Sequence, residues 1–270
     1  MSSSTILMCQ PDFFSVEYEI NHWMKGNVNQ AATGKAQSQW QDLMAVVEKC
    51  AKVTLIEPQK GLPDMVFTAN GALIHKNKAV VAKFQPKERQ GEENFFKDWF
   101  KDKGFEVCDA GDEPFEGAGD ALFDRGEDRL WAAHGFRSSL ETHKKIQEII
   151  GVEVLSLELV DPRFYHLDTC FCPLEGGYLM YYPKAFSPES QELIISRVAE
   201  EKLIRVSEDD ANNFALNAVN VGSNIIMHKA SAELRSSLEK EGFTVFETPV
   251  DEFMKAGGST KCLTLRLDEH

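Results

Sequence analysis

The same order of helix and strand occurs five times along the chain, and this repeat constrains the fold more than any other feature. Each copy has a polar amphipathic helix, a short β-branched strand, a loop and a second strand that begins at a polar residue. The expected helices span residues 39–49, 93–103, 141–150, 188–200 and 232–241. The expected first strands span residues 53–56, 104–107, 152–155, 203–206 and 242–246. Helices that alternate with short strands at a period of roughly 50 residues predict an α/β fold built from modules.

No linker rich in Pro, Gly or Ser separates the copies, so we expect one domain over residues 1–270. If five similar modules close into a ring, the equivalent strand ends meet at its axis. The residues delivered there would be Asn70, Glu116, His166, one residue within 213–217, and Cys262. The competing interpretation is that loose helix–strand alternation occurs in many unrelated α/β proteins.

Cys262 lies near the end of the chain, after two glycines and beside Lys261. Glycine permits tight backbone geometry, and a neighbouring lysine favours the thiolate form. With His166 and Glu116 this cysteine makes a set suited to nucleophilic catalysis. Each member also has an ordinary alternative: a small buried hydrophobe, a structural histidine and a loop cap.

Carboxylates are more numerous around these residues than a thiol nucleophile requires. Glu116, Asp120 and Asp168 lie in two of the motif loops, and Asp64 lies just before a third. Several acids near a thiol raise its pKa and disfavour a free thiolate. The arrangement suits a cationic substrate, because a planar guanidinium has five N–H donors that demand carboxylate or amide partners. An arginine-like substrate is therefore expected.

The charge and composition of the chain exclude some classes of binding partner. A formal net charge of −14 argues against nucleic acid and anionic membranes as partners, and it suits a small cationic substrate. No apolar run is long enough to span a membrane, and Met1–Thr5 lacks the features of a signal peptide. The six cysteines have neither disulfide nor zinc spacing, which favours the reducing cytoplasm and predicts no metal site. Association into a homo-oligomer stays open.

Four motifs resemble the guanidino-group-modifying enzymes of the pentein superfamily, which includes arginine deiminase, dimethylarginine dimethylaminohydrolase and amidinotransferases. The resemblance is greatest to the short arginine dihydrolases. The motifs come in the family's order and cover most of the chain: residues 63–70, 115–120, 166–168 and 257–262. This resemblance implies a five-bladed α/β propeller and a covalent mechanism without a cofactor.

The resemblance also implies roles for the central residues. Cys262 would attack the guanidinium carbon, and His166 would protonate the leaving amine and then activate water. Glu116 and Asp168 would hold the guanidinium nitrogens. Glu116 is thus expected to be catalytic together with Cys262 and His166.

Further residues would bind the rest of the substrate. By resemblance, Arg89 and Arg137 would hold the α-carboxylate, Asp64 would face the α-ammonium group, and Asn21 would supply a second amide. Asp120 is an alternative to Glu116 as the acid that contacts substrate. Without the resemblance, both arginines would be interpreted as solvated surface charges.

Two positions favour a dihydrolase, which converts arginine to ornithine, ammonia and carbon dioxide. Deiminases have aspartate where this chain has Asn70, and an amide can both donate and accept, which would retain a citrulline-like intermediate. Asp168 favours unmethylated arginine. The alternatives are arginine deiminase, dimethylarginine dimethylaminohydrolase and, more remotely, a pentein that binds without catalysis. Residues 117–119 are one longer than the usual Gly-Gly, which leaves the choice between Glu116 and Asp120 open.

Overall fold

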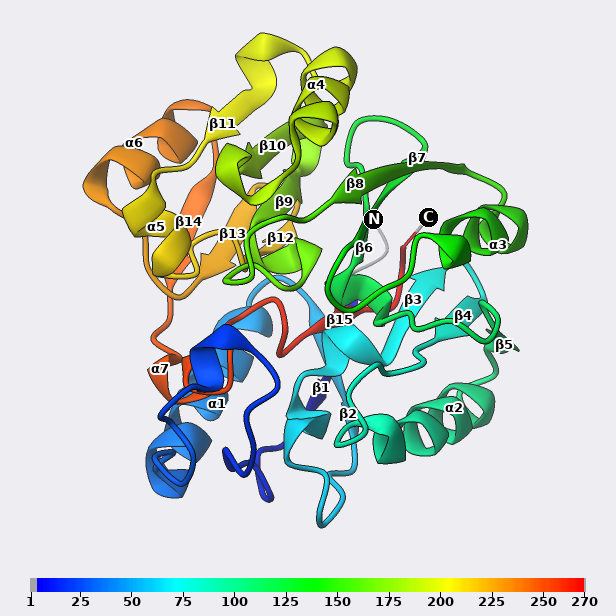
Figure 1. Cartoon of the computed structure of the whole chain (residues 1–270). Coiled ribbons are helices and arrows are strands. Elements are labelled where there is room, and N and C mark those ends of the chain that lie inside the picture. Colours follow the sequence, from blue (N-terminus) through cyan, green and yellow to red (C-terminus); the bar gives the residue numbers. More distant parts are fainter. Residues whose placement is uncertain (1–3, 270) are drawn as a thin grey trace.

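The computed structural model describes residues 4–269. Residues 1–3 and 270 lie outside it, and residues 1–3 belong to the segment in which no signal peptide was expected. Five sheets of three strands each stand around a common axis, and each is covered on its outer side by a helix (Figure 1). The expected five-bladed α/β propeller is therefore confirmed. No helix within residues 4–269 has the length and apolar character needed to cross a bilayer.

Each blade combines one antiparallel and one parallel strand pair around a middle strand. Blade 1 contains β15 (Leu265–Arg266), β1 (Thr5–Cys9) and β2 (Lys52–Ile56). Blade 2 contains β3 (Ala72–His75), β4 (Lys78–Val81) and β5 (Glu106–Cys108). Blade 3 contains β6 (Ala121–Phe123), β7 (Arg129–His134) and β8 (Glu153–Glu158). Blade 4 contains β9 (Phe171–Leu174), β10 (Tyr178–Tyr181) and β11 (Leu203–Arg205), and blade 5 contains β12 (Val219–Val221), β13 (Asn224–Met227) and β14 (Thr244–Glu247).

The two ends of the chain close the ring within blade 1. Strand β1 pairs antiparallel with β15, so Leu7 lies opposite Leu265, and it pairs parallel with β2 on its other side. Long-range pairing of this kind ties the last motif of the sequence to the first strand. The Cys262 segment thereby returns to the axis beside blades 4 and 5.

The boundaries of the sequence repeat differ from those of the blades. The first and second strands expected in one copy, such as β2 and β3, belong to neighbouring blades. The middle strands β1, β4, β7, β10 and β13 were not among the expected elements. They escape a period-2 search because they are buried on both faces: β10 and β13, for example, have three buried residues in a row.

The long helices lie on the outside of the ring and each covers one blade (Figure 1). They are α1 (Thr33–Val47), α2 (Glu93–Asp102), α3 (Glu141–Ile150), α4 (Pro188–Arg197) and α6 (Ala232–Lys240). Ser187 and Ser231 cap α4 and α6 by accepting backbone N–H groups, as N-cap serines do. The shorter helices α5 (Glu208–Asn212) and α7 (Asp251–Met254) lie in the connections after β11 and β14.

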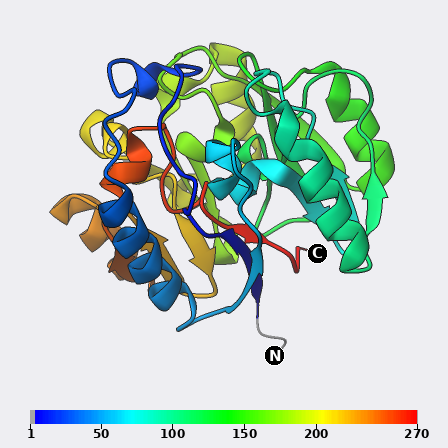
Figure 2. The same cartoon turned by 90° about the horizontal axis from the view of Figure 1, so that it is seen from below.

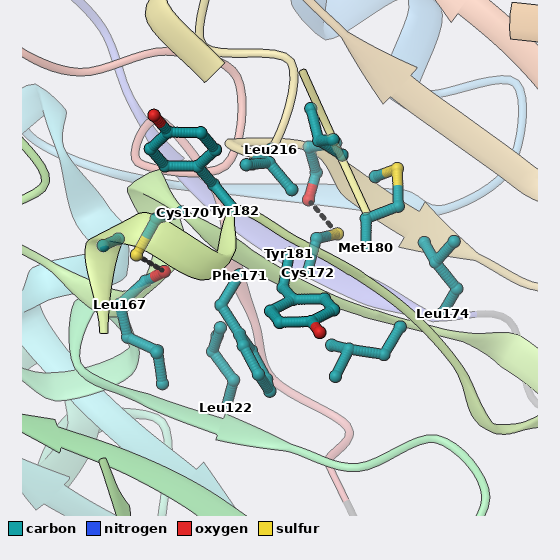
Figure 3. Packing of buried hydrophobic residues seen from close by; sticks show 14 of the residues in the cluster. Leu122, Leu167, Cys170, Phe171, Cys172, Leu174, Met180, Tyr181, Tyr182 and Leu216 are labelled. Carbon is teal, nitrogen blue, oxygen red and sulfur yellow. Dashed lines mark hydrogen bonds between the residues drawn. The ribbon is translucent and has the colours of Figure 1, made fainter. Parts of the chain in front are cut away.

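Apolar side chains fill the space between blades, as the packing around β9 and β10 illustrates (Figure 3). Phe171 and Tyr181 are buried there, and Cys172 Sγ lies 3.5 Å from the carbonyl oxygen of Ala218 at the start of blade 5. Burial raises the pKa of Cys172 to about 12, so this thiol stays neutral. The blades are thus held in fixed positions around the axis.

Candidate active site

Tight turns before the inner strands bring polar residues of different blades to one end of the axis. Asn70 lies in the 3-10 turn η3 (Thr68–Gly71), Glu116 directly precedes η5 (Gly117–Gly119) and His166 directly precedes η6 (Leu167–Thr169). These residues do not begin a strand, as the sequence pattern suggested, but lie in or directly before the turn that leads into one. A turn ends the strand hydrogen bonding, so the side chain can point along the axis and not into the sheet.

Glu116 is the centre of a buried charge cluster. One of its carboxylate oxygens accepts hydrogen bonds from His166 Nε2 at 2.7 Å and from Arg137 Nη1 at 2.9 Å. Burial alone would raise its pKa, but Arg137 and His166 together lower the pKa of Glu116 to about 2. Glu116 is therefore a permanent anion near neutral pH.

The ionised Glu116 fixes the orientation of His166. Because a carboxylate only accepts, His166 Nε2 must carry the hydrogen, and a neutral ring then has its lone pair on Nδ1. Nδ1 is buried and has no hydrogen-bond partner. The arrangement presents a free basic nitrogen with an acid behind it, the geometry of a general base and its orienting group.

Cys262 lies beside Asp168, in the turn that precedes β15. Its Sγ is 3.4 Å from the nearer carboxylate oxygen of Asp168 and accepts a hydrogen bond from Asn217 Nδ2 at 3.1 Å. Burial, with the charge of Asp168, raises the pKa of Cys262 well above its usual value. Burial likewise raises the pKa of Asp168 to about 6, an effect that Lys261 only partly offsets. The cysteine therefore rests as a neutral thiol.

Asn70 is fixed by Arg89. Arg89 Nη1 donates to Asn70 Oδ1 at 2.8 Å, so the amide oxygen is engaged and the amide nitrogen is turned the other way. Asn70 Nδ2 is buried without a hydrogen-bond partner. A β-carbon at Gly119 would lie 2.2 Å from that nitrogen, so only glycine fits there. The packing thus leaves Asn70 as an unused hydrogen-bond donor.

Arg89 and Arg137 are buried, with 3% and 5% of their surface exposed, so the interpretation as solvated surface charges is wrong. Arg89 makes two hydrogen bonds to Glu92, at 2.9 and 2.8 Å, besides those to Asn70 Oδ1 and to the carbonyl oxygen of Asp64. Since a guanidinium has five N–H donors, one donor of Arg89 is not used by these four hydrogen bonds. Arg137 also donates to the Ile20 carbonyl oxygen at 3.0 Å.

Asp64 and Asn21 connect the site to the loop of residues 10–31. Asp64 Oδ2 accepts a hydrogen bond from Tyr18 at 3.0 Å, and its buried Oδ1 has no partner. Asn21 has a structural role: its oxygen accepts the backbone N–H groups of Trp23 and Met24, and its nitrogen donates to the Ala256 carbonyl oxygen. Figure 2 shows this loop (blue) on the face opposite the chain ends. The loop covers the site from that side.

Both carboxylate oxygens of Asp120 already accept hydrogen bonds within the protein. Its two oxygens accept hydrogen bonds from the Ser138 hydroxyl at 2.7 Å and from the Leu167 backbone N–H at 3.0 Å. Ser138 in turn accepts the backbone N–H of Glu116 at 2.9 Å. Asp120 therefore joins the Glu116 turn to the His166 turn, and Glu116 is the acid with a cationic environment.

Sequence reasoning missed three residues that complete the site: Asn217, Glu92 and Tyr18. Asn217 was only bracketed within residues 213–217, and the repeat could have singled it out as the last polar residue before β12. Glu92 follows Arg89 by three residues, a spacing at which helical side chains meet. Tyr18 gave no signal in the sequence. Within residues 4–269 no cluster of three His, Cys, Asp or Glu side chains could hold a metal ion.

Comparison with known proteins agrees with this geometry. The sequence profile of the family described as N,N dimethylarginine dimethylhydrolase, eukaryotic, matches residues 10–268. The bifunctional arginine dihydrolase/ornithine cyclodeaminase AgrE of Nostoc sp. is 54% identical over 97% of this chain, but the chain spans only 38% of that relative's length. The N(G),N(G)-dimethylarginine dimethylaminohydrolase of Mycobacterium tuberculosis is 40% identical and covers 96% of this chain and 84% of its own.

Solved structures are similar over the whole ring. The N-terminal domain of ArgZ, an arginine dihydrolase of the cyanobacterial ornithine–ammonia cycle solved as a cysteine-to-serine mutant bound to substrate, superposes with a TM-score of 0.98 at 53% identity, covering 98% of both chains. A dimethylarginine dimethylaminohydrolase variant superposes with a TM-score of 0.80 at 19% identity, covering 97% of this chain and 98% of its own, which supports the fold alone. The chain belongs to the dimethylarginine dimethylaminohydrolase family.

Proposed function

We propose that this member of the dimethylarginine dimethylaminohydrolase family is an arginine dihydrolase, which hydrolyses the guanidinium group of arginine twice. The products are one ornithine, two ammonia and one carbon dioxide for two water molecules consumed. Both the 54% identical relative and the matching N-terminal domain carry the name arginine dihydrolase. Because the similarity to the longer relative covers 38% of it, the proposal includes no ornithine cyclodeaminase activity.

Charge complementarity supports a cationic substrate. Glu116, Asp168 and Asp64 are buried carboxylate groups of the site, Oδ1 of Asp64 has no partner, and Asp168 contacts the Cys262 thiol. A guanidinium bound between Glu116 and Asp168 would stabilise the ionised form of Asp168 and of the Cys262 thiol. The remaining N–H of Arg89, with Arg137, would receive the α-carboxylate, and Asp64 would face the α-ammonium group.

In the first hydrolysis the Cys262 thiol gives its proton to His166 Nδ1, and the sulfur forms a bond to the guanidinium carbon. The protonated His166 then donates that proton from Nδ1 to one terminal nitrogen, the C–N bond breaks and ammonia leaves. Water then adds to the carbon of the thioester-like amidino intermediate while His166 Nδ1 takes its proton. The C–S bond breaks, the thiol is regenerated, and the substrate has become a citrulline-like ureido compound.

The second hydrolysis depends on Asn70, and its orientation is the observation that carries the proposal. A ureido group has a carbonyl oxygen and needs a donor, which Asn70 Nδ2 supplies because Arg89 occupies the amide oxygen. An aspartate would offer only acceptors. Cys262 attacks the retained ureido carbon, the second ammonia leaves, and water releases a carbamate that breaks down to ornithine and carbon dioxide.

Dimethylarginine hydrolysis is the second candidate, favoured by the 40% identical relative with that name. Asp168 speaks against it, because a dimethylated nitrogen has no N–H to offer a carboxylate so close to the thiol. Arginine deiminase activity differs from our proposal only in releasing citrulline after one hydrolysis.

Incubation with arginine, citrulline and asymmetric dimethylarginine distinguishes these functions when ammonia, ornithine, citrulline and dimethylamine are quantified. We expect two ammonia per ornithine from arginine with little free citrulline. One ammonia with accumulated citrulline indicates a deiminase and contradicts the proposal. Dimethylamine release, with arginine left intact, indicates the second candidate. We propose further that the five blades act as one domain, so residues 1–270 alone should suffice for turnover.

A further inference from the structure

Asn217, which supplies blade 5's contribution to the axis, makes an unusual number of contacts to the loop that carries Cys262. Its side-chain oxygen accepts the backbone N–H groups of Ser259, Lys261 and Cys262 at 3.2, 3.0 and 3.1 Å. Its side-chain nitrogen donates to Cys262 Sγ at 3.1 Å and to the carbonyl oxygen of Asp168 at 2.9 Å. Asn217 is fully buried, so no solvent replaces these bonds.

The contacts leave Asn217 no alternative orientation. Three backbone N–H groups surround its oxygen, and a flipped amide would place donors against donors. The nitrogen therefore points at Cys262 Sγ. Its second hydrogen is donated to the backbone carbonyl oxygen of Asp168, whose side-chain carboxylate contacts the same sulfur. One amide thus sets both the shape of the nucleophile loop and its distance from blade 4.

We propose that Asn217 is a positioning residue that holds Cys262 against Asp168 and stabilises the sulfur as it becomes anionic. A hydrogen bond to a charged acceptor is stronger than one to a neutral acceptor, so the Nδ2–Sγ contact strengthens when the thiol ionises. The backbone N–H of Ser259 acts in the same direction on the sulfur. Asn217 holds that N–H in place through its own oxygen.

Other side chains near the same sulfur also influence the pKa of Cys262. Asp168 opposes ionisation, whereas Lys261 favours it. Tyr165, whose hydroxyl donates to the Gly257 carbonyl oxygen at 2.8 Å and whose ring lies 4.8 Å from the Arg137 guanidinium, is a neutral neighbour. Because none of these groups donates a hydrogen bond to Sγ, the contribution of Asn217 can be isolated by substitution.

The test is the rate at which iodoacetamide alkylates Cys262, followed by mass spectrometry of the Cys262 peptide across a range of pH. Loss of one donor to an anion predicts that Asn217→Ala lowers the alkylation rate at pH 8 about tenfold or more. The rate should stay below that of wild type across the pH range tested, because the wild-type thiol is itself ionised only to a small extent there. No arginine is involved, so the outcome is independent of the proposed dihydrolase activity.

Asn217→Asp separates the two functions of the amide. An aspartate keeps an acceptor for the three backbone N–H groups but replaces the donor that faces Sγ by an oxygen. We expect this variant to fold with a thermal midpoint closer to wild type than that of Asn217→Ala, while its alkylation falls at least as far. Failure of Asn217→Asp to fold would overturn the claim that the acceptor holds the loop.

Asn220 provides a matched control in the same blade. Its nitrogen also donates twice, to the carbonyl oxygens of Gly222 and Asn224, and not to Cys262 Sγ. Asn220→Ala should change thermal stability and leave the alkylation profile of Cys262 unchanged. A wild-type alkylation profile in folded Asn217→Ala or Asn217→Asp would overturn the proposal.

Discussion

Glu116 and Asp168 are both fully buried acids of the same site, but their surroundings give them opposite properties. Glu116 is paired with Arg137 and His166, and these partners outweigh burial and lower its pKa to about 2. Asp168 faces a neutral thiol, and burial raises its pKa to about 6. The negative charge of Glu116 is therefore balanced by cationic side chains of the protein. The negative charge of Asp168 is balanced only in part.

The difference assigns separate tasks to the two sides of the site. The Glu116 side is complete in itself and orients His166, so it is part of the folded structure. On the Asp168 side Lys261 offsets the negative charge only in part, and a buried charge without full compensation costs stability. Under the proposed function, a guanidinium substrate would supply the remaining charge at the place where the thiol ionises. The two sides can therefore be distinguished by the same substitution, acid to amide.

The largest effect is expected from Glu116→Gln. The change leaves Arg137 as a buried cation without its partner, which should cost about 3 kcal/mol or more of unfolding free energy. Turnover should fall about 10³-fold or more, because His166 loses the acceptor that fixes its tautomer. Urea unfolding and steady-state ammonia release measure the two effects.

Glu153→Gln is the matched control, since Glu153 forms an ion pair with Arg197 at 2.6 Å on the surface. Removal of that exposed pair should change stability by less than about 1 kcal/mol and leave turnover unaltered. Equal stability losses at the two glutamates would contradict the role given to the Glu116 cluster.

Asp168→Asn should have the opposite effect on stability. The pKa of Asp168 is raised in the folded state, so its ionisation costs stability above pH 6, and the amide removes that cost. We expect the variant to be more stable than wild type by about 1–3 kcal/mol at pH 8, while turnover of arginine falls about 10²-fold. A destabilisation as large as that of Glu116→Gln would show that Asp168 is compensated within the fold.

Asn70→Asp should change the products more than the rate. The new carboxylate favours the cationic guanidinium but offers no donor to a ureido oxygen, so the intermediate escapes. We expect free citrulline to become the main product, about tenfold over ornithine, measured by amino-acid analysis after arginine is consumed. An unchanged product ratio would remove Asn70 from the account of the second hydrolysis.

The smallest expected effect is the pH dependence of the difference in unfolding free energy between Asp168→Asn and wild type. The folded state holds the proton of Asp168 up to about pH 6, and the unfolded state releases it near pH 4. Stability from this group is therefore present at low pH and lost as pH rises between these values. The stability advantage of Asp168→Asn over wild type should grow across this window and then stay constant. An advantage independent of pH would contradict the raised pKa.

The fold was largely readable from the sequence, because outer helices and edge strands have clear periodicity and recur five times. Helix α3 was expected at its observed boundaries, residues 141–150. The middle strands were missed because burial on both faces removes the alternation that marks a strand. The pairing of β1 with β15 across the whole chain is a tertiary contact that no local pattern indicates.

Site residues could be predicted from the sequence only where they recur at equivalent positions of the repeat. Glu116, His166 and Cys262 met that condition, and the structure brings their turns to one end of the axis. Connections inside the site were not readable: the pairing of Arg89 with Glu92 and the contacts of Asp120 depend on which turns face each other after ring closure. The binding role of Asn21 stays a prediction, and its observed contacts hold the covering loop.

The most direct test of the central contrast is the ultraviolet difference spectrum of the Cys262 thiolate, taken as wild type minus Cys262→Ser. It should be recorded near neutral pH with and without a short alkylamidinium cation. We predict no thiolate signal in the free protein and a signal on addition of the cation, because the cation compensates Asp168 and the sulfur together. A full thiolate signal in the free protein, unchanged by the cation, would contradict the account.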